Sequence, residues 1–123
     1  MTRQSVPGEK PLYWIGSSLK DIVRCPSDVQ RCFGFALSAA QYGGKHQAAK
    51  PWKGEGPGVL EVVKDYDGDT YRAIYTVRFA RAVYVLHVFQ KKSPRRIETR
   101  QSDIVLVRDR LKAAQRDYEE RYG

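Results

Sequence analysis

Cysteine and long apolar runs are scarce in this chain of 123 residues, and each scarcity excludes a class of protein. Cys25 and Cys32 stand without a paired Cys/His set, so the sequence predicts reduced thiols and no zinc centre. The N-terminal stretch "MTRQSVPGEK" has no apolar run of the kind that a signal peptide needs, and no stretch elsewhere approaches the length of a membrane span. We therefore expect a cytoplasmic protein that does not bind a membrane.

Acidic residues are also few: 14 carboxylates face 22 Lys and Arg residues, which gives a formal net charge of +8. A basic domain attracts polyanions at long range, so nucleic acid or the ribosome is the leading class of partner, and a merely solvated basic face is the alternative. The cations also gather in two places. Lys45, Lys50 and Lys53 have no carboxylate among them, and residues 90–100 hold five cations against Glu98 alone.

Periodicity predicts a single α+β domain over residues 10–123 after a flexible leader at residues 1–9. We expect, in order, an N-terminal strand at "PLYWIG", a helical hairpin that begins at Ser17-Ser18 and ends at Gly43-Gly44, a Gly/Lys loop, a three-stranded antiparallel meander, and a C-terminal helix from Ser102. Asp67-Gly68 marks the first turn of the meander. The helices are expected on one face of the sheet, which leaves the other face open to a ligand.

Alternation along the strand "YRAIYTVRF" separates a core side from an open side. The predicted core side holds Tyr71, Ala73, Tyr75, Val77 and Phe79. The predicted open side holds Arg72, Ile74, Thr76 and Arg78. Arg72 and Arg78 then share the open face and could reach the end of the next strand, where Lys91 and Lys92 lie, and such a cluster suits a phosphate group. On these residues alone, RNA cleavage and simple phosphate binding both stay open.

Metal and cofactor sites find no support in the sequence. The run "DYDGDT" is a hairpin turn and lacks the spacing of a calcium loop, and "KGEGPG" lacks the spacing of a phosphate-binding loop. His46 and His87 are not at metal-ligand spacing. We expect His87 to be a buried histidine on the same strand side as Val85 and Phe89, while Trp52 is a candidate for stacking on a base.

The segments "KPWKGEGPGVLEVV", "YRAIYTV" and "VYVLHVFQKKS", in this order over about Lys10 to Tyr118, resemble the RelE/ParE superfamily of bacterial toxins, most closely its HigB-like, phage-associated branch. The resemblance implies a RelE-like fold and a type II toxin–antitoxin system. It implies a metal-independent endoribonuclease, without cofactors, that cleaves mRNA in the ribosomal decoding site. A cognate antitoxin, expected to be of the helix-turn-helix type, would neutralise it.

The same resemblance implies roles for individual residues. Arg72 would hold the scissile phosphate, and Lys91 and Lys92 would stabilise the transition state or protonate the leaving group. The residues implied to bind RNA are Lys50, Lys53, Arg78, Arg95 and Arg96. Glu61 is expected to pair with Arg72 rather than to act as a base. Ile97, Glu98 and Thr99 stand where many RelE-type enzymes have a tyrosine or histidine for proton transfer, so either a lysine takes that role or the ribosome orients the 2′-hydroxyl.

Two other functions remain as alternatives. A ParE-like poison of DNA gyrase would use the same scaffold without a phosphate-cleaving site. A non-enzymatic nucleic-acid-binding domain would need only the net charge and Trp52.

Overall fold

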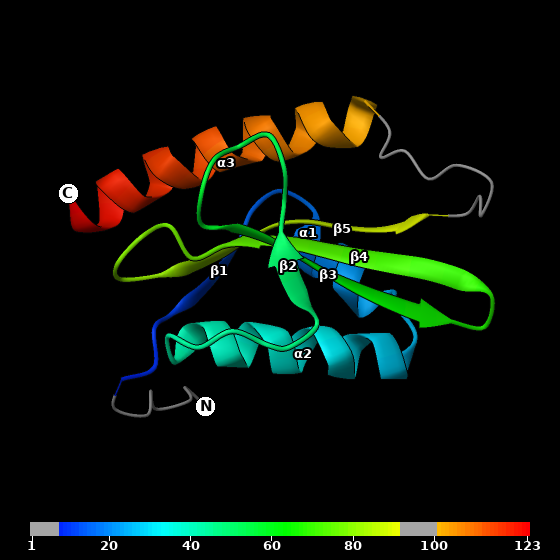
Figure 1. Cartoon of the computed structure of the whole chain (residues 1–123). Helices are drawn as coiled ribbons and strands as arrows, with labels where there is room; N and C mark the ends of the chain where they lie inside the picture. Colours follow the sequence, from blue (N-terminus) through cyan, green and yellow to red (C-terminus); the bar gives the residue numbers. More distant parts are fainter. Residues whose placement is uncertain (1–7, 92–100) are drawn as a thin grey trace.

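The computed structural model describes residues 8–91 and 101–123 (Figure 1). Residues 1–7, which are most of the predicted leader, lie outside the described residues. Lys92, Arg95 and Arg96 also lie outside them, so the predicted roles of these three cations stay predictions.

The described chain forms one five-stranded sheet with three helices (Figure 1). The elements are β1 (Leu12–Trp14), α1 (Ser18–Val23), α2 (Ser27–Gln41), β2 (Ala49–Pro51), β3 (Val59–Tyr66), β4 (Asp69–Thr76), β5 (Val83–Lys91) and α3 (Gln101–Tyr122). The strand order is β1-β5-β4-β3-β2, with β1 parallel to β5 and the other neighbours antiparallel. This confirms a mixed α+β fold whose centre is the predicted meander β3–β4–β5.

The hairpin between β3 and β4 turns at the predicted dipeptide. Asp67 and Gly68 both have positive φ angles, of 51° and 82°. Two consecutive positive φ angles define the tight turn that matches the twist of an antiparallel hairpin, and Asp-Gly is one of the few dipeptides that adopts it without strain. The turn therefore sets the register in which Glu61 of β3 lies opposite Ile74 of β4.

The helices cover both faces of the sheet, so the prediction that they share one face is wrong. Figure 1 shows α2 on one side of the sheet and α3 on the other. The α2 side buries Val62, Ala73, Tyr75 and Val85 with Phe33 and other α2 residues, and the α3 side buries Ile74, Tyr84 and Leu86 with Val107, Leu111 and Ala114. The reason lies in β5, whose residues from Val83 to Val88 are all buried. A strand that is apolar on both faces requires cover on both faces.

A β-bulge in β5 sets the direction of His87. The pairing passes from Ile74 opposite His87 to Tyr75 opposite Val85, which leaves Leu86 as an extra residue. The inserted residue reverses the alternation. Val85 packs with the α2-side cluster, whereas His87 bonds to Asp103 of α3 and stacks on Phe89. His87 is buried, as expected, but it does not share a strand side with Val85.

Candidate nucleic-acid interface

An ion pair between Arg72 of β4 and Glu61 of β3 lies at the centre of the candidate site. Arg72 Nη1 is 2.5 Å from Glu61 Oε2, and the two side chains are only 17% and 7% exposed. The predicted pairing of these residues is confirmed. Because the carboxylate holds one end of the guanidinium, the orientation of Arg72 is fixed before any ligand arrives.

Lys50 approaches the same carboxylate from the other side. It pairs directly opposite Glu61 across β2 and β3, and its Nζ lies 3.8 Å from Glu61 Oε1. Glu61 therefore lies between two cations from neighbouring strands. The short strand β2 was not predicted, and it is the element that places Lys50 here.

The register of β4 and β5 brings Lys91 onto the same face as Arg72. Arg72 pairs with Phe89, and Thr70 pairs with Lys91, so Lys91 is the diagonal neighbour of Arg72. Diagonal neighbours on one face of a sheet are about 7–8 Å apart, which is within reach of long side chains around a single phosphate group. Of the predicted catalytic residues, Arg72 and Lys91 thus share a face of the sheet.

The segment of residues 52–58, which carries Lys53, is held in place by two arginines. The guanidinium of Arg78 donates to the carbonyl oxygens of Glu55 and Pro57, and Arg108 Nε lies 3.2 Å from a carboxylate oxygen of Glu55. Gly58 has a φ of +87°, and a Cβ there would lie 3.1 Å from the Cα of Arg78. The structure thus places Arg78, a predicted RNA-binding residue, in contacts that position the loop.

A pocket of about 420 Å³ opens between this loop and the start of α3. It is lined by Lys50, Pro51, Trp52, Lys53, Glu61 and Ile104. Trp52 is only 6% exposed and packs with the α3-side cluster, so its ring forms part of the wall rather than a free stacking platform. The contribution of Ile104 was not predicted, because no pattern local to α3 indicates which strands the helix faces.

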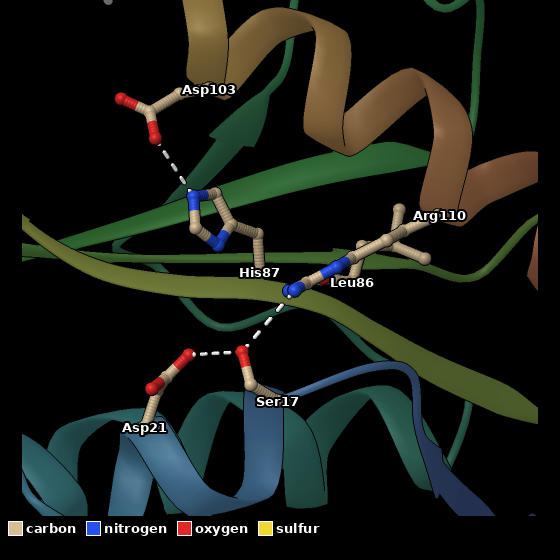
Figure 2. Close-up of polar contacts among 6 residues, drawn as sticks. All are labelled: Ser17, Asp21, Leu86, His87, Asp103 and Arg110. Atoms are coloured by element: carbon tan, nitrogen blue, oxygen red, sulfur yellow. Dashed lines mark hydrogen bonds and ion pairs between the residues drawn. The ribbon is translucent and has the colours of Figure 1, made fainter.

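On the α3 side of β5, His87 and Asp103 form a buried pair that ties α3 to the sheet. His87 Nε2 lies 2.9 Å from Asp103 Oδ1 (Figure 2). The imidazole ring stacks on Phe89, the cross-strand partner of Arg72. Burial lowers the pKa of His87 below its usual range, although the carboxylate of Asp103 opposes that shift. His87 is therefore a neutral structural contact next to the site at pH 7.

Arg110 of α3 reaches past the edge of β5 toward α1 (Figure 2). It donates to the carbonyl oxygen of Leu86 and to the hydroxyl of Ser17, and Ser17 in turn donates to Asp21. Leu86 is the extra residue of the bulge in β5. This network joins the helices of the two faces of the sheet next to His87.

Within residues 8–91 and 101–123, no group of three or more His, Cys, Asp or Glu side chains is placed to hold a metal ion. No helix in the same ranges is both long and apolar enough to cross a bilayer. This part of the chain places cations around a buried carboxylate, an arrangement that suits an anion with further hydrogen-bonding groups.

Comparison with known proteins gives one family. Neither a curated protein nor a solved structure matches the chain significantly. Residues 20–112, which are more than half of the chain and contain Glu61, Arg72 and Lys91, match the family described as "Phage derived protein Gp49-like (DUF891)". The chain therefore belongs to the Gp49-like family of phage-derived proteins, which is part of the RelE/HigB-type toxin group.

Proposed function

We propose that this chain is the toxin of a type II toxin–antitoxin system of the HigB-like type, and that it inhibits translation by cleaving mRNA in the ribosome. The observation that carries the proposal is the placement of Arg72 and Lys91 as diagonal neighbours on one face of the sheet, beside Lys50 and Glu61. Membership of the Gp49-like family supports the same assignment.

Arg72 holds the scissile phosphate in this proposal. One nitrogen of its guanidinium is bonded to Glu61, and its Nε is buried without a partner among the described residues. A guanidinium has five N–H donors, so donors remain for two phosphate oxygens while Glu61 keeps the group oriented. Because negative charge grows on these oxygens as the 2′-hydroxyl oxygen attacks phosphorus, a preoriented Arg72 stabilises the transition state more than the ground state.

Proton transfer to the leaving group falls to the lysines at the end of β5. As the bond from the 2′-oxygen to phosphorus forms, the 2′-hydroxyl gives its proton to water, the bond from phosphorus to the 5′-oxygen of the next nucleotide breaks, and that 5′-oxygen gains a proton. Lys91 lies on the site face and is the donor we assign to the leaving oxygen, together with Lys92, which is outside the described residues. The ribosome orients the 2′-hydroxyl, and such positioning is worth roughly 7–11 kcal/mol of the barrier.

The test is induced expression of the chain under tight control, followed by mapping of mRNA 5′ ends in cells and in a translation extract. We expect codon-linked cuts that fall by a factor of about 100 or more in Arg72→Ala, the loss typical of one transition-state donor. Arg116→Ala is the matched control, because Arg116 is exposed on α3 and cuts should be unchanged. DNA breaks with intact mRNA would favour a gyrase poison instead, and normal growth at high expression would contradict a toxin of either kind.

The proposed partner can be tested separately. A small helix-turn-helix protein encoded in the adjacent reading frame is expected to be the antitoxin and to restore growth on co-expression. A co-expressed neighbour that fails to bind the chain would contradict that pairing while leaving the cleavage assay untouched.

A further inference from the structure

The lining of the pocket beside Glu61 differs from that of a site for a phosphate group alone. Two of its lining residues are cations, Lys50 and Lys53, but its lining also includes the apolar residues Trp52 and Ile104, both of which pack with the α3-side cluster. Glu61 adds a carboxylate, which repels phosphate. Apolar walls next to a hydrogen-bond acceptor suit a flat ring whose edge carries N–H donors, as a nucleobase does.

The two oxygens of Glu61 differ in their partners. Oε2 accepts a hydrogen bond from Arg72, whereas Oε1 has Lys50 Nζ at 3.8 Å and no hydrogen bond to any residue in the described ranges. An ionised carboxylate has about four lone-pair positions, so Oε1 and the second lone pair of Oε2 remain for a ligand. The carboxylate of Glu61 in this pocket can therefore accept hydrogen bonds from two adjacent donors of a ligand.

Guanine is the base that matches such an acceptor. Its Watson–Crick edge carries two adjacent donors, N1–H and the N2 amino group, which a carboxylate accepts together. Adenine and cytosine present one donor beside an acceptor nitrogen, and the N3–H of uracil lies between two carbonyl oxygens that a carboxylate repels. A site built to accept from paired donors discriminates strongly against ligands that lack them, because its buried polar groups are then left unpaired.

The walls of the pocket are fixed in advance. The backbone N–H of Trp52 donates to the carbonyl of Val59, and Arg78 and Arg108 hold the rest of the loop through Glu55 and Pro57. Little conformational entropy is lost when a ligand enters a site that is already ordered.

We propose that this pocket binds the guanine base of the nucleotide next to the cleaved linkage, with Glu61 accepting hydrogen bonds from the base edge and Trp52 and Ile104 packing against its faces. The inference rests on the proposed function for the identity of the ligand as RNA. Glu61 then has two tasks, since the same carboxylate orients Arg72 on the phosphate side and reads the base on the other. The site thereby couples recognition of one base to the position of the phosphate contact.

Binding of mononucleotides to the full chain tests the proposal without any cleavage step. Trp14 and Trp52 are the two tryptophans of the chain, so Trp14→Phe leaves Trp52 as the sole indole fluorophore in the wall of the pocket. We expect 5′-GMP to change the fluorescence of Trp52 and to bind at least about 10-fold more tightly than AMP, CMP, UMP or ribose 5-phosphate. Equal affinities for all five compounds, or no change with any of them, would overturn the base site.

Three variants sharpen the test. Ile104→Ala removes one wall, and we expect GMP to bind about 5-fold more weakly while ribose 5-phosphate is unaffected. Val105→Ala is the matched control, because Val105 is the next residue on α3, is 42% exposed and lies outside the pocket, so GMP affinity should not change. Glu61→Gln replaces one acceptor by a donor and should abolish the preference for GMP. Thermal unfolding checks that the Glu61→Gln variant folds. If that variant does not fold, the GMP affinity of Ile104→Ala tests the base site.

The two proposals fail in different ways. Cleavage of mRNA by a chain that binds the five compounds equally would overturn the guanine site alone. Selective binding of GMP by a chain that leaves mRNA intact in cells and extracts would overturn the nuclease assignment alone.

Discussion

The two halves of α3 pack against the same face of the sheet with opposite chemistry. Toward its C-terminus the helix meets an aromatic cluster in which Phe79 stacks on Tyr118 at 4.7 Å and Tyr118 contacts Tyr122 at 4.9 Å. The polar atoms there are paired: Tyr84 donates to Asp117 at 2.6 Å, and Arg121 donates to the same carboxylate. We call this the aromatic end.

The N-terminal half of α3 faces the residues of the candidate site, which we call the site end. Three buried polar atoms there have no hydrogen-bond partner among the described residues: Trp52 Nε1, Arg72 Nε and His87 Nδ1. Unpaired buried polar atoms cost stability, so a fold keeps few of them, and a cluster of them calls for an explanation. The contrast teaches that the aromatic end holds the fold together while the site end gives up hydrogen bonds around a set of oriented cations.

Removing the centre of the aromatic end should have the largest effect on stability. Tyr118→Ala deletes a ring that stacks on Phe79 and contacts Tyr122, and it also removes a hydroxyl that accepts a hydrogen bond from the backbone N–H of Arg81. We expect the free energy of unfolding, measured by urea titration, to fall by about 3 kcal/mol. The exposed control Arg116→Ala should change it by less than about 0.5 kcal/mol. A loss below about 1 kcal/mol for Tyr118→Ala would show that the two ends of α3 do not differ as described.

Two single-hydroxyl deletions at the aromatic end compare a hydrogen bond to a charged acceptor with one between neutral groups. Tyr84→Phe leaves the fully buried ring but removes its bond to the Asp117 carboxylate, which should cost about 2 kcal/mol because the acceptor is ionised. Tyr13→Phe removes the bond between two neutral hydroxyls, Tyr13 and Tyr122, at 3.0 Å, and should cost about 1 kcal/mol. Both variants should keep full mRNA cleavage. Equal losses for the two, or reduced cleavage in either, would contradict the division of labour between the ends.

The pH dependence of stability reports on the site end. Burial lowers the pKa of His87, while Asp103 and Arg110 from α3 and Asp21 from α1 act on it from their sides. In the unfolded chain the imidazole of His87 therefore binds a proton near pH 6.5, whereas in the folded chain it binds that proton only at a lower pH. The free energy of unfolding thus falls as the pH drops below about 6.5, until the pKa of His87 in the folded chain is passed. One proton gives a slope of at most about 1.4 kcal/mol per pH unit.

His87→Gln should remove that slope between about pH 7 and pH 5, as measured by urea unfolding at a series of pH values. His46→Gln is the matched control, because His46 is the other histidine of the chain and should leave the slope in place. A slope that survives in His87→Gln and disappears in His46→Gln would contradict this account of the buried pair.

Local patterns predicted the elements of the fold better than their packing. Asp67-Gly68 has a backbone requirement of its own, and the alternation of β4 correctly separated Arg72 and Ile74 from Ala73 and Tyr75. The side of the sheet that α3 covers depends on pairings between distant residues, such as His87 with Asp103, which no local pattern contains. The prediction of an open sheet face failed because the apolar length of β5 was taken as a sign of a central strand and not of cover on both faces.

The site was predictable to the same extent. Arg72, Glu61 and Lys91 follow from strand alternation and from the family resemblance, and the pairing of the first two was expected. Strand β2 was missed because three residues that include Pro51 give too short a pattern to detect. The pocket was missed as well, since it needs β2, the loop and α3 together.

The smallest expected effect distinguishes a cation that binds RNA from one that only adds charge. Lys53 lines the pocket and is exposed, so Lys53→Ala should change the free energy of unfolding by less than about 0.5 kcal/mol. Binding of labelled single-stranded RNA, followed by fluorescence anisotropy over a range of salt concentrations, should instead lose about 0.7 from the slope of log K against log salt, the value for one phosphate contact. Lys20→Ala removes the same charge from the exposed surface of α1, and it should leave the slope unchanged. Equal slopes for Lys53→Ala and the unmodified chain would show that Lys53 does not contact the RNA. An equal loss of slope in Lys53→Ala and Lys20→Ala would show that RNA binds to a diffuse basic surface and not to the site end.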